Sequence, residues 1–424
     1  MRKDLCATGL IKAIHQKFTK ITEGRQFTRK NNITLLDCLM SCYAVFSLKW
    51  PSLLQYEEEK KNPHILKNLQ DLYLVKTPPS DTYMRERLDE VDPDNLRPAF
   101  KKVFALAQRG KVLEQYQFLD GYYLFSTDGT GHFSSHKVHC PNCCVKDHFN
   151  GKHTYYHNMM GGAIVHPDRR EVVPFCPEPI RLQDGMSKND CEQMASRRQL
   201  RVLRKEHPHL KIIVIQDALA DSGPNVQLIE SLEMKYIIVR KGNIFAWMDP
   251  SKISCYDFTD EQGIVHKYRF VNGIPLNGVH RDIKTNIFEH VMITPKGKEK
   301  KGAWITNILI TEENIHQLMR GGRARWKIEN ETFNTLKNQG YHFEHNFGHG
   351  NRNLCTVMCF LMVLAFLVDQ LQLISCDAYQ EAKSMTRTFV SFWEKMRTFF
   401  SYLELNSWEK LFGLISRKIL LDTS

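Results

Sequence analysis

The segment of residues 211–232 most constrains the fold of this chain. It opens with Lys-Ile-Ile-Val-Ile-Gln (211–216), a run too short for a helix and apolar enough for a central strand. Asp217 follows directly, and further on Ser222 is suited to cap a helix and Pro224 to occupy its first turn. A strand followed by an acid, a turn and a helix is the wiring of an α/β sheet whose ligand site lies at the carboxyl ends of its strands.

A second acid, Asp128, ends another predicted strand. The run Gly-Tyr-Tyr-Leu-Phe-Ser-Thr-Asp (121–128) is followed at once by Gly-Thr-Gly (129–131). This pattern indicates a buried strand that delivers a carboxylate into a glycine-rich turn. An isolated aspartate after a strand is usually a turn or cap residue, and this alternative applies to Asp128 and Asp217 alike.

A third acid, Glu329, lies on the apolar stripe of a predicted helix. The stripe is made by residues at steps of three, four and three: Trp326, Glu329, Phe333 and Leu336. The carboxylate is therefore expected to point inward, where an unpaired charge is expensive, so that it must be protonated, paired or bound to a metal ion. The simplest alternative is an ion pair with Arg325, one turn earlier.

Taken together, the three acids resemble the catalytic acids of DDE transposases from bacterial insertion sequences. Asp128 lies in Thr-Asp-Gly-Thr-Gly, Asp217 in Asp-Ala-Leu-Ala-Asp, and Glu329 in Arg-Trp-Lys-Ile-Glu-Asn. The resemblance covers roughly residues 115–372 and is closest to the group with a Tyr, Arg, Glu, Lys signature around the last acid.

The chain departs from that signature at two places. It has Gly322 where the family has the tyrosine, and it has Leu336 where the family has the lysine, with Lys337 one place later. These shifts put the roles of the tyrosine and the lysine in doubt, whereas Arg325 and Glu329 stay in place.

The resemblance implies a fold and an activity. The expected fold is α/β, an RNase H-like mixed sheet flanked by helices and interrupted by a β-rich insertion, with an N-terminal helical region. The expected activity is metal-dependent cleavage of double-stranded DNA at transposon inverted repeats, followed by strand transfer into target DNA. Asp128, Asp217 and Glu329 would be catalytic and would hold two Mg²⁺ or Mn²⁺ ions, whose preferred ligands are hard oxygens. A homodimer in the synaptic complex, in a bacterial cytoplasm and on the nucleoid, is expected too.

Contacts to DNA are expected from basic and aromatic side chains. Arg325, Lys327 and Lys337 are placed to hold the phosphate backbone, and Trp304 or Trp247 to stack on a base, although a tryptophan in a sheet is more often a core residue. The formal net charge of +11 and the pI near 9.0 favour a polyanionic partner. Two alternatives remain: a nuclease of the same fold without strand transfer, and a DNA-binding transposase remnant without activity.

Hydrophobic residues make up 42% of the 424 residues and charged residues 25%, which indicates a globular chain of several regions. An apolar run at 354–368, ended by Asp369, is shorter than the ~20 residues of a membrane span and predicts a buried helix, so no membrane partner is expected. Five regions are expected. Residues 1–114 would form a helical region for DNA-end recognition, with a basic cluster at 17–30. Residues 115–242 and 311–372 would form the two pieces of the catalytic core on either side of the insertion at 243–310, and residues 373–424 would form a C-terminal helical region.

A cluster of cysteines and histidines follows the strand of Asp128. A Cys-x-x-Cys turn preorganises two thiolates for zinc, and the expected structural Zn²⁺ ligands are Cys140, Cys143, Cys144 and His148. The alternative is a reduced, partly buried thiol pair with His157 packed in the next strand. Twelve cysteines and an N-terminus without a long apolar stretch lead us to expect reduced thiols in a cytosol.

Overall fold

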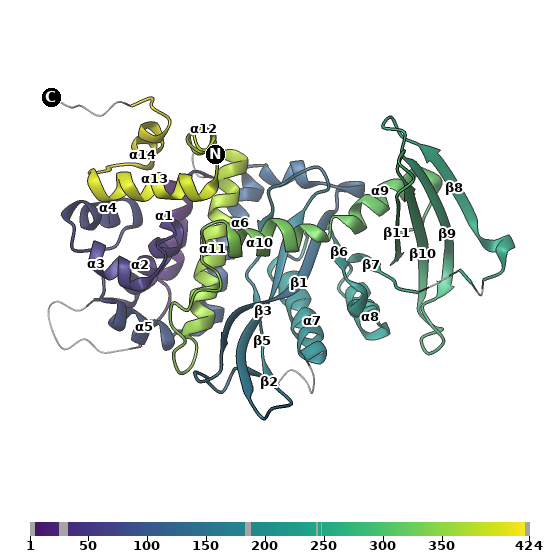
Figure 1. Cartoon of the computed structure of the whole chain (residues 1–424), viewed down its shortest axis with the longest axis horizontal. Helices are drawn as coiled ribbons and strands as arrows, with labels where there is room; N and C mark the ends of the chain where they lie inside the picture. The colour runs from purple at the N-terminus through teal and green to yellow at the C-terminus, as the bar shows by residue number, and fades with distance from the viewer. Residues whose placement is uncertain (1–4, 25–32, 183–187, 243–244, 247, 420–424) are drawn as a thin grey trace.

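The computed structural model describes residues 5–24, 33–182, 188–242, 245–246 and 248–419. The N-terminal and C-terminal helices lie together at one end of the molecule, the central sheet lies in the middle, and a β-rich lobe lies at the other end (Figure 1).

The central sheet has the strand order of an RNase H-like core. A hairpin of β1 (Tyr123–Ser135) and β3 (His153–Val165) is antiparallel, while β6 (Ile212–Gln216) and β7 (Lys235–Val239) follow β1 in parallel. Three short strands pair with β3: β2 (Cys144–Asp147), β4 (Val173–Pro174) and β5 (Glu178–Ile180). All five residues of β6 are buried, as its β-branched run requires of a strand covered on both faces.

Helices cover both faces of this sheet. The connections between strands are α7 (Lys188–Glu206), which precedes β6, and α8 (Gly223–Ser231), which precedes β7. A side chain at Gly161 of β3 would meet Phe333, whereas one at Gly162 would meet Gln199 of α7. Successive residues of a strand point to opposite faces, so α7 and the segment around Phe333 lie on opposite sides of the sheet.

The segment between Asp217 and Glu329 extends the same sheet. Its strands form an antiparallel meander: β8 (Ser254–Thr259), β9 (Val265–Pro275), β10 (Lys284–Ile293) and β11 (Glu299–Thr306). β11 pairs with β7 through Trp304–Val239 and two further pairs, giving the order β2-β3-β1-β6-β7-β11-β10-β9-β8. Short 3-10 turns precede this meander: η6 (Ala218–Ala220) and η7 (Pro250–Lys252).

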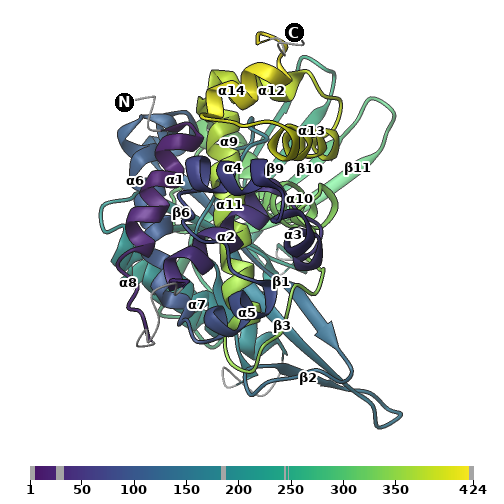
Figure 2. The ribbon, with the colours of Figure 1, turned by 90° about the vertical axis from the view of Figure 1, so that its left-hand side faces the viewer.

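Helices from both ends of the sequence pack around α11 (Leu354–Ser375) (Figure 2). The N-terminal ones are α1 (Ala7–Phe18), α2 (Leu35–Leu48), α3 (Leu53–Glu59), α4 (Pro63–Tyr73), α5 (Asp81–Asp89) and α6 (Arg97–Arg109), with the turns η2 (Pro93–Leu96), η3 (Val112–Tyr116) and η4 (Leu119–Gly121). The C-terminal ones are α12 (Asp377–Ser384), α13 (Phe389–Tyr402) and α14 (Trp408–Ile415). α13 buries the apolar side chains of Phe392, Trp393 and Met396.

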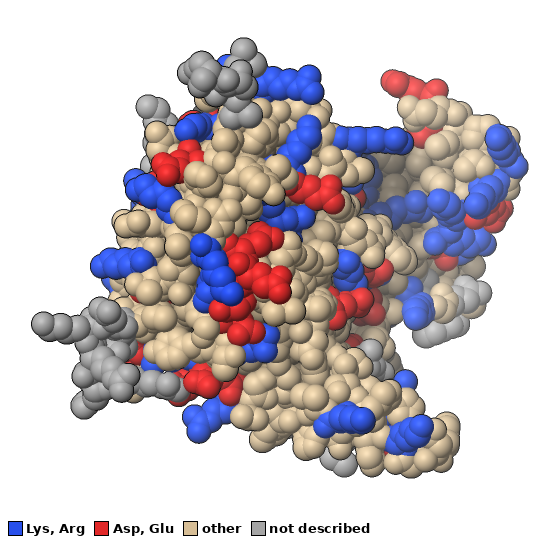
Figure 3. Space-filling model, turned by 60° about the vertical axis from the view of Figure 1, so that its left-hand side comes forward, with Lys and Arg blue, Asp and Glu red and all other residues tan. Residues whose placement is uncertain are grey.

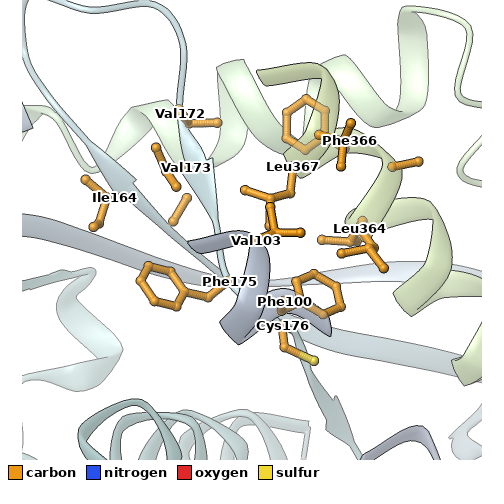
Figure 4. Close-up of a cluster of buried hydrophobic side chains, with 14 of the residues drawn as sticks. Phe100, Val103, Ile164, Val172, Val173, Phe175, Cys176, Leu364, Phe366 and Leu367 are labelled. Carbon is orange, nitrogen blue, oxygen red and sulfur yellow. The ribbon is translucent and has the colours of Figure 1, made fainter. Parts of the chain in front are cut away.

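α11 is long and apolar enough to cross a membrane by length and composition, and 94% of its most apolar window is buried inside the protein. It links the helical region to the sheet, because α2, α5, α6 and β4 all contact it. Figure 4 shows some of this junction, where Leu364 and Leu367 of α11 meet Phe100 and Val103 of α6 beside Phe175.

Candidate active site and metal centre

Asp128 lies in the middle of β1 and not at its end. The strand continues to Ser135, with Asp128 opposite Gly161 and a register shift beyond Gly131, so that the predicted glycine-rich turn is strand. Instead, Gly129 allows α7 to lie close to the strand, because a Cβ at Gly129 would lie 3.1 Å from a carboxylate oxygen of Glu192 on α7.

The carboxylate of Asp128 is largely buried and held from two sides. Its Oδ1 accepts the N–H of Gly129 at 2.8 Å, and its Oδ2 lies 3.1 Å from Nη1 of Arg325. Burial has the largest effect and raises the pKa of Asp128 to about 6. The Gly129 N–H and the Arg325 guanidinium lower this pKa, whereas the neighbouring Glu329 carboxyl raises it.

Arg325 joins the first and third acids. The same Nη1 that contacts Asp128 donates to Oε1 of Glu329 at 2.9 Å, which is the ion pair named as the alternative for Glu329. The arginine side chain is 10% exposed, and its backbone oxygen accepts the hydroxyl of Ser126 on β1. The guanidinium is therefore a fixed cation between two carboxylates.

The expected apolar stripe around Glu329 is only half buried, because the helix is not regular there: Phe333 and Leu336 lie in the core, whereas Trp326 and Glu329 do not. α9 (Glu312–Arg323) ends before the acid, a π-helical turn η8 (Ile328–Phe333) carries it, and α10 (Asn334–Asn338) follows. A π-turn is wider than an α-turn and rotates the faces of the helix. Trp326 is 56% exposed and the Glu329 side chain 36% exposed, whereas Ile328 and Thr332 are buried.

Asp217 follows β6 as expected and caps the turn η6. Its Oδ1 accepts the N–H of Leu219 at 3.1 Å, which is the cap role named as the alternative. It also lines a cavity of about 70 Å³ together with Asp128, and Glu192 of α7 belongs to the same wall. The structure thus brings Asp128 and Asp217 to one cavity, while Glu329 reaches Asp128 from outside it.

Glu192 is an acid that sequence reasoning missed. It lies on a strongly charged helix without an apolar pattern that would mark it, and only the neighbouring glycines hint at a close neighbour of β1. Within the described residues of the chain, the acids Asp128, Asp217 and Glu329 do not form a group whose ligand atoms all lie within 4.8 Å of one another. Their oxygen donors nevertheless suit a hard divalent cation.

The expected DNA-contacting lysines are engaged within the protein. Lys327 donates to the backbone oxygen of Arg169 at 2.5 Å, and Lys337 forms an ion pair with Glu344 at 2.8 Å. Each also lines a groove: Lys337 one of about 1620 Å³ beside β2, and Lys327 one of about 1080 Å³ between α9 and the β-rich lobe. Leu336, where the family signature has lysine, is fully buried.

Trp304 lies in the core, which is the alternative to base stacking named from the sequence. The side chain is 4% exposed, and its ring stacks on Phe288 with 5.2 Å between centroids. A Cβ at Gly322 would come within 2.5 Å of its indole nitrogen, so this position has no room for a side chain. Trp247 and residues 25–30 of the basic cluster expected at 17–30 lie outside the described residues.

Two of the four expected zinc ligands come together, and two do not. Cys140 and Cys143 converge with His157 of β3 and His349, a residue far along the chain that the sequence did not indicate. Cys144 instead directs its thiol toward the backbone oxygen of Ile180, and His148 pairs with Thr154 at 2.7 Å. Strand alternation explains the loss of Cys144, because β2 begins there and turns its side chain away from Cys143.

No family model matches this chain, and no curated protein sequence matches it. Among solved structures, the chain is similar to a piggyBac transposase in a synaptic complex with hairpin DNA, with a TM-score of 0.39 and 10% sequence identity. The alignment covers 98% of this chain and 80% of that one. We assign no family from a likeness at this level.

Proposed function

We propose that this chain is a transposase of the DDE type, which cleaves DNA at transposon ends and joins the freed ends to target DNA. The observation that carries the proposal is the shared cavity of Asp128 and Asp217, which come from adjacent parallel strands of an RNase H-like sheet. Glu329 supports it as the third acid, since it is tied to Asp128 through Arg325.

The donor set fits a divalent cation. A carboxylate that is buried beside other carboxylates, as Asp128 is, gains from a neighbouring positive charge, and its raised pKa reflects that need. Asp128 and Asp217 would hold the ion, with Glu329 adjoining from the side of Asp128. Bound Mg²⁺ or Mn²⁺ would supply Lewis-acid stabilisation of the scissile phosphate. Arg325 is placed to keep Asp128 and Glu329 aligned.

The groove beside the β-rich lobe, which is basic on the side of α9 and carries Asp260 and Glu261 on the other side, supports DNA as the substrate. Arg320, Arg323 and Lys327 of the Glu329 segment face the turn after β8 and the strands β9 and β10 across this groove. Lysine and arginine side chains also gather on the β-rich lobe and on the core across from it (Figure 3). Phosphate contacts along this path would lead a duplex toward Asp128, with affinity that falls as salt rises.

The remaining assignments belong to the same proposal. The helical region of residues 1–114 would recognise transposon inverted repeats, and the β-rich insertion of residues 243–310 would contact the DNA ends between the two core pieces, 115–242 and 311–372. The C-terminal helices of residues 373–424 would complete the helical end. A homodimer would pair two ends, and the protein would work in a bacterial cytoplasm on the nucleoid.

The test uses oligonucleotides that carry the inverted repeats flanking the gene, incubated with the full chain and Mg²⁺ or Mn²⁺. Cleaved and joined products are separated on denaturing gels. We expect Asp128→Asn, Asp217→Asn and Glu329→Gln to lower the cleavage rate by about 10³-fold or more, because each removes a ligand charge. The matched control is Glu331→Gln, on the same π-turn but paired with the exposed Arg170, which should stay within about twofold of the parent.

Three results would decide against the proposal. If Asp217→Asn or Glu329→Gln cleaves DNA as fast as the parent chain, these acids do not take part in the chemistry. Cleavage without joined products favours a nuclease of the same fold, and DNA binding without any cleavage in either metal favours the inactive remnant.

A further inference from the structure

We propose that Cys140, Cys143, His157 and His349 form a structural Zn²⁺ site, separate from the carboxylate cavity. Their ligand atoms all lie within 4.8 Å of one another, and among the residues that the structure describes no other such group of His, Cys, Asp or Glu occurs. Three of the four side chains are buried, and Cys140 is nearly so at 9% exposed.

The distances between the ligand atoms match a tetrahedron. The two sulfur atoms are 3.9 Å apart, and the two Nε2 atoms of His157 and His349 are 3.2 Å apart. Sulfur–nitrogen distances are 3.3–3.4 Å, from Cys140 and Cys143 to His157 and from Cys143 to His349. Zinc bonds of about 2.3 Å to sulfur and about 2.0–2.1 Å to nitrogen, at tetrahedral angles, require separations of about 3.8, 3.3 and 3.5 Å respectively.

Backbone hydrogen bonds position these ligands for metal binding. The turn Cys140–Cys143 is closed by the N–H of Cys143 on the oxygen of Cys140 at 3.1 Å, and the N–H of Cys140 points at the sulfur of Cys143 at 3.4 Å. The Nδ1 of His349 lies 2.8 Å from the backbone oxygen of Gly350, so it carries the proton and leaves Nε2 free to bind a metal.

The ligand types select the metal. Two thiolates with two imidazoles in a closed tetrahedron are the usual set for structural zinc, whereas Mg²⁺ prefers six oxygen ligands. The competing account of the same cluster is four neutral groups packed together, two thiols and two imidazoles, without an ion. The free thiols of Cys140 and Cys143 are not bonded to each other.

The site would fasten the hairpin of Asp128 to the segment that follows Glu329. His157 lies on β3, next to the strand of Asp128, and His349 lies in the irregular stretch between α10 and α11. That stretch is also anchored by Asp89, whose carboxylate accepts the N–H groups of residues 351–354. Zinc would therefore hold the two catalytic segments in register without entering the chemistry.

The first experiment measures metal in the purified full-length chain. We expect about one zinc per chain by mass spectrometry of metals. After removal of the metal under reducing conditions, added Co²⁺ should give the visible absorption of a tetrahedral site and a near-ultraviolet band from cobalt–thiolate bonds. A chain that carries no zinc after growth with added zinc, and that shows no such Co²⁺ spectrum, would overturn the proposal.

Variants then separate this ligand set from its neighbours. Cys143→Ser and His349→Gln should lose the bound zinc and weaken the Co²⁺ spectrum, whereas the controls Cys144→Ser and His148→Gln should keep about one equivalent. Equal loss in Cys144→Ser and Cys143→Ser would contradict the assignment. Because the wild-type Co²⁺ spectrum needs no variant to fold and no DNA, its outcome is independent of whether the chain is a transposase.

Discussion

Gly322 is small because Trp304 fills the space that a side chain there would occupy. The sequence pattern alone predicted a strand around Trp304, but it does not say which face of the strand meets a helix. Here β11 is covered by α9, so the indole is buried at the junction of the β-rich lobe and the core. Gly322 thus allows two elements far apart in the sequence, α9 and β11, to pack closely.

This packing role gives a prediction at the residue scale. Trp304→Ala should lower the free energy of unfolding by about 3–5 kcal/mol, since it opens a cavity against Phe288. Urea denaturation measures the loss. The matched control is Trp326→Ala, whose parent side chain is 56% exposed and which should cost less than about 1 kcal/mol. A base-stacking role would show the reverse: intact stability in Trp304→Ala with weakened DNA binding.

The three acids could be identified from the sequence, whereas their arrangement in space could be predicted only in part. Asp128 and Asp217 lie on adjacent parallel strands, and the strand–acid patterns point to the same edge of a sheet. The role of Glu192 and the separation of Glu329 from the cavity depend on how α7 and the π-turn pack, which no local pattern records.

At the scale of elements, α11 extends past the apolar run that predicted it. The sequence suggested that Asp369 ends the helix, yet the helix continues to Ser375. The carboxylate is tolerated inside because Lys49, at the end of α2, forms a buried ion pair with it and Tyr341 donates to it at 2.7 Å. Lys49 also lies over the ring of Trp393 on α13, so one buried cation connects three helices.

The Lys49–Asp369 pair should behave as a unit. Asp369→Asn and Lys49→Met should each destabilise the chain by about 3–5 kcal/mol, because each leaves a buried charge without its partner. The double variant should cost clearly less than the sum of the two single losses. Chemical denaturation of all four proteins measures the coupling, and simple additivity would show that the pair does not interact.

At the scale of the whole molecule, local patterns predicted the class of fold but not the contacts between residues far apart in the sequence. The order of strand, hairpin, helix and strand along residues 123–239 follows from alternation and β-branched runs. The pairing of β11 with β7, which brings the insertion into the same sheet, joins residues more than 60 positions apart. The meeting of His157 with His349 spans 192 positions, so the Cys-x-x-Cys turn alone suggested nearer partners.

Buried histidines from different regions of the fold set the response of the whole molecule to acid. Burial lowers the pKa of His207 to about 4, with Lys101 acting in the same direction, and lowers that of His290 to about 3, with Arg323 contributing. In the unfolded chain these rings take up protons near pH 6.5, whereas the folded chain does so only at lower pH. The unfolded state therefore binds more protons below pH 6.5, and stability falls as the pH is lowered.

The expected loss is up to about 1.4 kcal/mol per pH unit for each such histidine between pH 6.5 and about 4. Among the described residues, four acids act in the opposite direction, because burial raises their pKa and this favours the folded state as the pH falls: Asp128, Glu206, Glu230 and Asp369. They are outnumbered by the histidines, since burial also lowers the pKa of His15, His132, His166, His316 and His342. Urea denaturation at pH 7, 6 and 5 measures the slope. His207→Phe keeps an aromatic ring against Phe104. In this variant the loss of stability per pH unit should decrease by the contribution of one histidine. A stability that is unchanged or higher at pH 5 than at pH 7 would show that these rings are already protonated in the folded chain.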